Sequence, residues 1–394
     1  MSFEIALSGI NAINSQLDTI SNNIANTGTY GFKSSRANFA SMYAGMQPAG
    51  AEVGSLTQSI DIGGGVVTTG RGLDAAIQGR GFFVMRDGSG ATLFTRVGIF
   101  AADKDGFVVD SFGRKLQGYA AGDAGALGAM GDITVPTGQV AARASGSVKY
   151  VGNLSADWSP PAVATFDPAV PQSFNGSMVS VVYDSLGARH TLTQYFVRGA
   201  TNEVTVHYSF DGSELPTTST LAFGSDGQLV SPTGPVSHAL GTPAGANPLT
   251  VAVDYAGTTQ FAGEATTTVN AADGYASGTL IGVQLSEDGA VMAQYSNGQK
   301  ARVATVALAT FPNENALVPV SDTSWTTSNA SGTALYFAPG TGMAGKLTPG
   351  ALEQSNVDMT SELVTLMSAQ RNYQANTKVI STENEMVQTL MQAL

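Results

Sequence analysis

The stretch that decides the fold is residues 1–27, MSFEIALSGINAINSQLDTISNNIANT, which contains one glycine, no proline and no lysine or arginine. Steps of three and four residues through it meet only apolar side chains: Phe3, Ala6, Ile10, Ile13, Leu17, Ile20 and Ile24. An apolar repeat of about 3.5 residues is typical of a helix that packs along a second helix. The sequence therefore predicts an N-terminal helix that needs a long helical partner.

The C-terminal residues 357–394 carry a matching pattern. Asp358 suits an N-cap, and Glu362 lies in the first turn, where the helix dipole favours an acidic side chain. One apolar column recurs every seventh residue: Met359, Leu366, Tyr373, Ile380, Val387 and Leu394. A companion column is apolar at its ends and polar in its middle: Leu363, Gln370, Thr377, Asn384 and Met391. We expect this helix to be the partner of the first.

Between the two ends the hydrophobic repeat shortens to two residues. Apolar and polar side chains alternate in residues 203–210 and 249–255, as they do in half-buried strands. Tight-turn pairs recur along the same region: Asp87-Gly88, Asp105-Gly106, Asp211-Gly212, Asp226-Gly227, Asp288-Gly289 and Asn297-Gly298. The sequence predicts a mainly β protein with α-helical termini, in which most of residues 71–350 form antiparallel strands.

Composition divides the chain into nested parts. Residues 41–70 hold seven glycines and predict an extended or irregular connector. Residues 149–283 hold ten acidic and three basic side chains, a net charge of −7, and predict an inserted, solvent-facing β domain. Four parts are expected. Residues 1–27 with 357–394 form a coiled-coil-like inner helical domain, and 28–70 with 351–356 form an extended connector. Residues 71–148 with 284–350 form a discontinuous β domain, and 149–283 form the outer β domain.

Composition also excludes several classes of function. The 394 residues carry a net charge of −12, which argues against a nucleic-acid partner. The absence of Cys excludes a disulfide scaffold, a thiol nucleophile and Cys-ligated metal sites. No apolar run approaches the roughly 20 residues that span a bilayer. The first basic residue is Lys33, so we expect no cleaved secretory signal.

Neither a catalytic site nor a cofactor or metal site is predicted. The three histidines, His190, His207 and His238, lack the spacing of metal ligands. The glycines of residues 63–65 and 79–81 lack the other residues of a nucleotide-binding loop. We therefore expect a protein that is not an enzyme.

Four separated stretches resemble the bacterial flagellar axial proteins, the family that builds the rod and the hook. In chain order they are SNNIAN (21–26) with TYGFK (29–33); GRGLDAAIQGRGFF (70–83) with TRVG (95–98) and LQGY (116–119); YSNGQ (295–299); and SNVD (355–358) with AQRNYQAN (369–376). YDSLG (183–187), His190 and YFV (195–197) resemble the outer domain of the hook branch of this family.

The resemblance implies a structural subunit that polymerises into a short curved tube and acts as a flexible joint, which transmits motor torque from rod to filament. It implies as partners other copies of the chain, rod and hook–filament junction proteins, a cap during assembly and the flagellar export apparatus, with no nucleic acid and no membrane insertion. The expected location is extracellular, in the flagellum.

Two alternatives stay open at this point. One is a distal-rod or hook-associated axial protein of the same family. The other is a secreted β-rich module that binds carbohydrate or surfaces, which predicts a monomer with an aromatic-lined groove. Trp158 and Trp325 are too few and too scattered to favour the second alternative.

Two sets of residues are predicted to carry assembly. The first set is an interface with neighbouring copies, because a two-helix pair has little core of its own: Phe3, Ile10, Ile13, Leu17, Ile20, Ile24, Leu363, Leu366, Gln370, Arg371, Tyr373, Ile380, Val387 and Met391. The second set is a joint between the helices and the β layer: Asn22, Asn23, Asn26, Gly31, Phe32 and Lys33. Here asparagine amides turn the chain, Gly31 permits a positive φ, and Lys33 pairs with an acid.

Overall fold

The structure is a computed structural model that describes residues 2–44, 47–122 and 126–393. Contacts between residues divide the chain into two compact units, each described by itself. Unit 1 comprises Met1–Thr137, Ile281–Gln294 and Lys300–Leu394, and unit 2 comprises Gly138–Leu280 and Tyr295–Gln299. The finer four-part division expected from composition stays a prediction.

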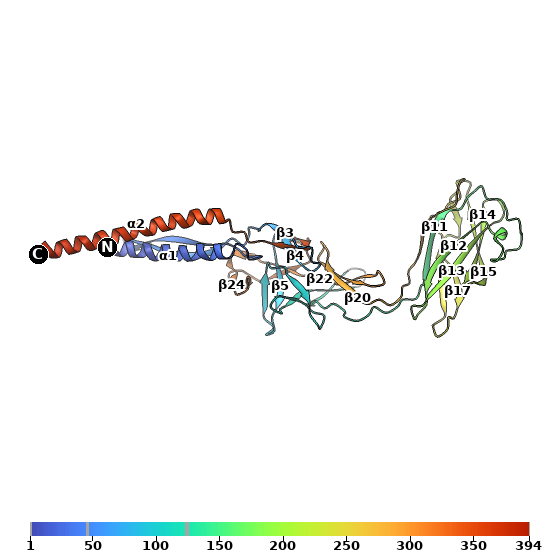
Figure 1. Cartoon of the computed structure of the whole chain (residues 1–394), viewed down its shortest axis with the longest axis horizontal. Helices are drawn as coiled ribbons and strands as arrows, with labels where there is room; N and C mark the ends of the chain where they lie inside the picture. The colour runs from blue at the N-terminus through green and yellow to red at the C-terminus, as the bar shows by residue number, and fades with distance from the viewer. Residues whose placement is uncertain (1, 45–46, 123–125, 394) are drawn as a thin grey trace. The chain divides into compact units, whose positions relative to one another are not determined.

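Two helices of unit 1 run side by side, α1 (Ser2–Ala25) and α2 (Met359–Ala393) (Figure 1). At a rise of about 1.5 Å per residue, α1 is roughly 36 Å long and α2 roughly 52 Å. Asp358 caps α2 as predicted, since its Oδ1 accepts the backbone N–H groups of Thr360 (2.8 Å) and Ser361 (3.2 Å). The prediction of paired terminal helices is confirmed.

A long antiparallel hairpin, β1 (Ser35–Ala44) with β2 (Gln47–Gln58), follows α1 and packs along it. The sequence predicted an extended or irregular connector here, and within it these two segments are extended and pair regularly with each other. An isolated two-stranded hairpin is marginal in water, so the support comes from α1. Ser8 on α1, for example, accepts the N–H of Ala51 at its Oγ (3.3 Å).

The remaining strands of unit 1 form one large sheet and two small ones. The large sheet runs in the order β20-β21-β22-β9-β5-β6-β25-β24, with further strands paired to it. Its strands are β5 (Phe82–Arg86), β6 (Thr92–Thr95), β7 (Phe100–Ala102), β8 (Val108–Asp110), β9 (Lys115–Ala121), β10 (Leu127–Asp132), β20 (Leu280–Leu285), β21 (Ala290–Tyr295), β22 (Lys300–Val306), β23 (Leu308–Thr310), β24 (Val318–Val320), β25 (Ser324–Thr326) and β26 (Leu335–Phe337). Strands that precede unit 2 in sequence therefore pair with strands that follow it.

Aromatic side chains fill the core of this sheet. Phe82 packs against Trp325 at a ring distance of 5.5 Å, and Phe94 meets Phe311 edge-on at 4.8 Å. The two small sheets pair β4 (Ala75–Gln78) with β27 (Lys346–Pro349) and β3 (Val66–Thr68) with β28 (Ala351–Glu353). A short 3-10 helix, η3 (Glu314–Ala316), precedes β24. The β3–β28 pair brings the chain back to the base of the helices.

Unit 2 is a sandwich of two sheets. One sheet has the order β12-β13-β14-β15-β16 and the other β17-β18-β11-β19. The elements are β11 (Ser147–Asn153), η2 (Pro171–Ser173), β12 (Gly176–Tyr183), β13 (Arg189–Arg198), β14 (Glu203–Phe210), β15 (Ser213–Phe223), β16 (Leu229–Ser231), β17 (Val236–Gly241), β18 (Leu249–Asp254) and β19 (Thr266–Ala272). The β11–β18 pair is parallel, an exception to the predicted antiparallel arrangement.

The alternation predicted for residues 203–210 and 249–255 places Val204, Val206 and Val251 in the core of unit 2. A buried hydrogen-bond chain crosses that core. The hydroxyl groups of Tyr208 and Tyr255 are 2.7 Å apart, and Tyr208 also bonds to Ser219. Burial holds the Tyr255 pKa well above its ordinary value. The prediction of a mainly β protein with helical ends is confirmed.

Candidate assembly site on the terminal helices

Two contacts fix the register of α1 against α2. Asn23 Nδ2 donates to Glu362 Oε1 at 2.9 Å. At the other end, a methyl group added to Gly9 would lie 3.2 Å from Asn376 Nδ2, so a side chain here would crowd the neighbouring helix. In both pairs the residue numbers add up to 385, so the helices are antiparallel. From residue 384 onward α2 has no counterpart on α1.

The seam between the helices is narrow. Ile13, Ile20 and Ala369 are buried in it, and the partly buried residues packed on them are Leu17, Ile24 and Leu366. The seam predicted for the first helix therefore faces α2. Since a single buried row on each helix is a small core, the pair gains only part of the stabilisation that helices of this length normally gain from packing.

The companion column predicted for α2 does not face α1. Leu363, Gln370, Thr377, Asn384 and Met391 are all exposed, whereas the residues one position earlier are buried or half-buried: Glu362, Ala369, Asn376 and Glu383. The small side chain of Ala369 lets the two backbones approach, and Glu362 bonds to Asn23. The companion column is therefore not part of the seam within one chain. Its role in assembly stays a prediction.

The structure splits the predicted interface residues into two groups. Those that face the partner helix or are half-buried are Ile10, Ile13, Leu17, Ile20, Ile24, Leu366 and Ile380. Those left exposed are Phe3, Leu363, Gln370, Arg371, Tyr373, Val387 and Met391. The side chains of the second group face solvent within the described part of one chain, so they are free to contact another copy.

Two exposed apolar patches lie on α2. The base patch consists of Met359, Leu363, Val364 and Met367, and the tip patch of Met386, Val387, Leu390 and Met391. In the tip patch Leu390 is 64% exposed and Met391 is 73% exposed. Contiguous exposed apolar side chains on a water-soluble surface mark a site of interaction.

The predicted joint lies where α1 ends. Asn23 is almost fully buried and bonds to two other segments, because its side chain exchanges hydrogen bonds with both backbone groups of Ser35 (2.8 and 2.9 Å) and donates one to Glu362. Asn26 Nδ2 donates to the backbone and side-chain oxygens of Asn22, both at 3.0 Å, and closes the last turn. Asn23 therefore ties α1, β1 and α2 together.

Gly31 occupies a position that no other residue fits well. Its φ is +68°, in the left-handed region, and an added Cβ would lie 2.9 Å from backbone atoms of Arg96 and Val97. Its N–H donates to the Glu353 carbonyl at 2.8 Å, and the next carbonyl, of Phe32, accepts the N–H of Asn356 at 3.4 Å. The turn after α1 is thus fastened to the segment that leads into α2.

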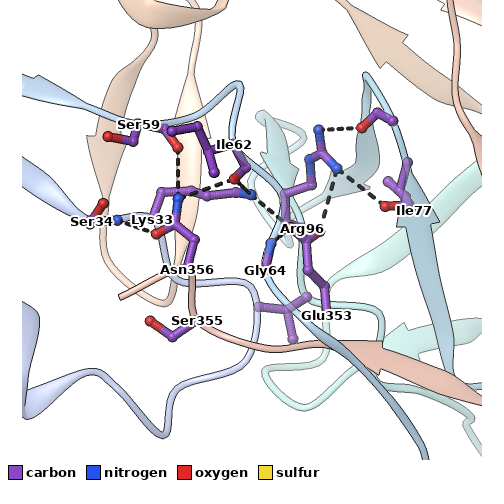
Figure 2. A network of polar contacts seen from close by, with 12 residues as sticks. Lys33, Ser34, Ser59, Ile62, Gly64, Ile77, Arg96, Glu353, Ser355 and Asn356 are labelled. Carbon is purple, nitrogen blue, oxygen red and sulfur yellow. Dashed lines mark hydrogen bonds and ion pairs between the residues drawn. The ribbon is translucent and has the colours of Figure 1, made fainter. Parts of the chain in front are cut away.

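A buried ion network underlies the joint (Figure 2). Lys33 Nζ lies 2.7 Å from Glu353 Oε1 and also donates to the Ile62 carbonyl at 2.7 Å. Arg96 Nη1 lies 3.4 Å from Glu353 Oε2, and its Nη2 donates to the Gly79 carbonyl at 2.9 Å. Burial lowers the pKa of Lys33 and of Arg96, and the nearby Glu353 carboxylate opposes that shift. The prediction that Lys33 pairs with an acid is confirmed.

Sequence reasoning missed three members of this network. Asn356 accepts the Ser34 N–H at its Oδ1 (2.7 Å) and donates through Nδ2 to the carbonyls of Ser59 (2.9 Å) and Ile62 (3.1 Å) (Figure 2). Arg96 and Glu353 supply the remaining charges. A signal did exist, because Arg96 and Asn356 fall inside the TRVG and SNVD stretches and Glu353 lies just before the latter.

The histidines lie in unit 2 and form ordinary side-chain contacts. His190 bonds through Nδ1 to Asp211 (2.6 Å) and through Nε2 to Asp184 (3.4 Å), while His238 is buried between Thr217 and Ser219. Among the residues that the structure describes, no cluster of three or more His, Asp or Glu side chains is arranged to hold a metal ion. In the same residues, no helix is long and apolar enough to span a membrane.

Four protein families match successive parts of the chain. They are described as flagella basal body rod protein (residues 3–33), flagellar hook protein FlgE/F/G D1 domain (76–156), flagellar basal body protein FlaE D2 domain (153–275) and flagellar basal body rod FlgEFG protein C-terminal (348–393). The terminal matches cover the helices and the joint. Unit 2 contains the D2 match.

Relatives of nearly the same length carry one name. The flagellar hook protein FlgE of Salmonella typhimurium is 38% identical over 99% of both chains, and that of Escherichia coli is 36% identical over 99% of both. That of Treponema pallidum is 31% identical over 98% of this chain and 97% of its own. The crystal structure of Helicobacter pylori flagellar hook protein FlgE2 shares the fold, with a TM-score of 0.52 over 71% of this chain and 98% of that one at 13% identity.

These names favour the hook branch over the distal-rod alternative and over a secreted binding module. The likeness extends over both helices, the joint and both units, so it does not rest on one shared domain. The chain therefore belongs to the family of flagellar hook proteins, and it is a structural subunit of the flagellar hook rather than an enzyme.

Proposed function

We propose that this hook subunit polymerises through its terminal helices into a curved helical tube, a flexible joint that transmits motor torque from rod to filament. The observation that carries the proposal is that the α1–α2 pair covers one seam and leaves the base and tip patches of α2 exposed. In a tube, each copy contacts its neighbours through different surfaces that do not close into a ring, as a filament requires.

The helices form the inner, rigid layer in this proposal. Fully burying a Leu or Met side chain contributes about 1.5–3 kcal/mol, and the four residues of the tip patch are between 51% and 73% exposed, so burying what remains would contribute roughly 4–7 kcal/mol. The freedom lost when two proteins associate costs about 4–15 kcal/mol. The free energy gained by burying the tip patch therefore roughly offsets the cost of one intersubunit contact. Several such contacts per copy would make the wall of the tube stable.

The joint residues transmit force from this layer to the β layer. Asn23 and the Lys33–Glu353–Arg96 network tie the ends of both helices to strands of unit 1. The predicted acidic outer domain, residues 149–283, supplies more polar contacts that can slide as the tube bends. Curvature then comes from the outer layers while the inner helices keep their register.

The partners and the location follow from this role. Other copies of the chain are the main partner, and rod and hook–filament junction proteins bind the two ends of the tube. The flagellar export apparatus delivers the chain without cleavage of a signal peptide, and a cap guides assembly outside the cell. The four-part domain division from composition belongs to the same proposal.

Complementation tests this function. The chain is expressed in its own bacterium, in a strain that lacks the chromosomal copy, and cell-surface appendages are viewed by electron microscopy. We expect short curved tubes between rod and filament and restored motility. Motile cells without the chain, or a chain that is exported but leaves rods bare, would contradict the proposal.

A further inference from the structure

A groove beside the helix pair borders the joint. It lies between α1 and the edge strand β24, with a volume of about 320 Å³. The residues that matter for its chemistry come from α1, from β2, and from β24 with the residue before it: Asp18, Asn22, Leu56, Gln58, Leu317 and Pro319. A helix is about 10–12 Å across, so this volume suits one long side chain rather than a whole helix.

The groove is acidic and open. Asp18 is exposed and makes no ion pair in the described part of the chain. None of the residues that line the groove is Lys, Arg or His. Strand β24 lies at the end of its sheet with Val318 and Val320 exposed, and Leu56 on the facing wall is 65% exposed. An occupant would therefore be cationic at its end and apolar along its stem.

The complementary surface lies on α2, on the side away from the seam. Val364, Met367, Arg371, Gln374 and Lys378 follow one another at intervals of three and four residues, and all are exposed. Within the described residues neither Arg371 nor Lys378 has an ion-pair partner. Arginine is the side chain best suited here, because its guanidinium binds a carboxylate through two parallel hydrogen bonds while its stem covers apolar surface.

One chain cannot bring these two surfaces together. Arg371 lies opposite the α2 row of Leu366 and Ala369 that packs on α1, so it points away from the α1 of its own chain. We infer that the groove between α1 and β24 accepts the Arg371 side chain of a second copy, with the guanidinium on Asp18. The inference rests on the proposed function, because polymerisation supplies the second copy.

Cysteine cross-linking tests the contact directly, since the natural chain has no Cys. The full-length double variant Asp18→Cys/Arg371→Cys is assembled into hooks, and the hooks are oxidised and run on a non-reducing gel. We expect a ladder of disulfide-linked multimers that neither single variant gives. Normal hooks without a ladder would overturn the inference and leave the hook function intact.

Charge reversal gives a second, independent readout of the same contact. Arg371→Glu is expected to lower the number of hooks per cell about tenfold, and Asp18→Arg/Arg371→Glu to restore it, because close charge pairs at interfaces couple strongly. The matched control Asp18→Arg/Lys378→Glu makes the same change in net charge. It is expected not to restore the number of hooks, because Arg371 keeps its positive charge and would face the arginine introduced at position 18. Equal rescue by both double variants would overturn the inference. Failure of the unaltered chain to form hooks would instead refute the proposed function.

Discussion

Lys33 Nζ and Glu353 Oε1 lie 2.7 Å apart although 320 positions separate the two residues in the sequence. Both side chains are almost wholly buried, so each charge depends on the other for its solvation. The same carboxylate also lies 3.4 Å from Arg96, so Glu353 forms ion pairs with two buried cations. This pair holds the exit from α1 against the entry to α2.

Removing the anion should destabilise unit 1 strongly. Because breaking a buried ion pair leaves an uncompensated charge, Glu353→Gln is expected to lower the free energy of unfolding by about 3–5 kcal/mol. Lys104→Gln is the control, since Lys104 pairs with Asp105 on the surface and should change stability by less than about 1 kcal/mol. Denaturant unfolding of the full chain measures both variants. Equal effects would contradict the role given to the buried pair.

A methyl group at residue 31 should loosen the joint. Gly31→Ala places a Cβ 2.9 Å from two backbone atoms at a φ of +68°, and the expected loss is roughly 1–3 kcal/mol. Gly88→Ala is the matched control, because nothing lies within 4 Å of an added Cβ there. Thermal unfolding compares the two variants. A Gly31→Ala chain as stable as the control would show that the turn can relax.

Polar substitutions in the tip patch should impair polymers and spare monomers. Leu390→Ser/Met391→Ser removes two exposed apolar side chains, so the melting temperature of the monomer should stay the same. The concentration needed for polymerisation should rise at least about tenfold, because one buried apolar side chain contributes roughly 1.5–3 kcal/mol. Gln388→Ser and Gln392→Ser are controls from the same turns of α2. Sedimentation of the polymers supplies the measurement, and unchanged polymerisation would exclude the tip patch from the interface.

Acidic pH should stabilise the part of unit 2 around His190. The hydrogen bond to Asp211 raises the pKa of His190 above its ordinary value of 6.5. A raised folded-state pKa adds stability that is fully present below pH 6.5 and is lost as the pH rises through the folded value. His190→Gln should remove this pH dependence, whereas His207→Gln should keep it. Melting curves of unit 2 in the full chain, recorded between pH 5 and 9, make the comparison. A gain in stability toward acidic pH that survives His190→Gln would refute the assignment, because burial lowers the pKa of His207 and His238 and gives them the opposite dependence.

Much of the fold could be predicted from periodicity alone. The row Ile13 to Ile20 identified the face of α1 that packs on α2. On α2 the residues that face α1 include Glu362 and Asn376, which periodicity did not identify because polar side chains look like surface positions. The hairpin of β1 and β2 was missed because its stability comes from α1 rather than from its own pattern. Glu353 could not be paired with Lys33, since no local rule links residues so far apart.

The large sequence separation between paired segments has a consequence for how the chain folds. Ile20 finds its neighbour Ala369 only after nearly every other residue is available, and β9 must likewise wait for β22. Contacts between such distant segments form slowly, because a large loop has to close before they yield any gain. If the amino end of a subunit is delivered first, α1 stays without its partner α2 until the C-terminal residues arrive. The α1–α2 pair can therefore form only when delivery of the chain is complete.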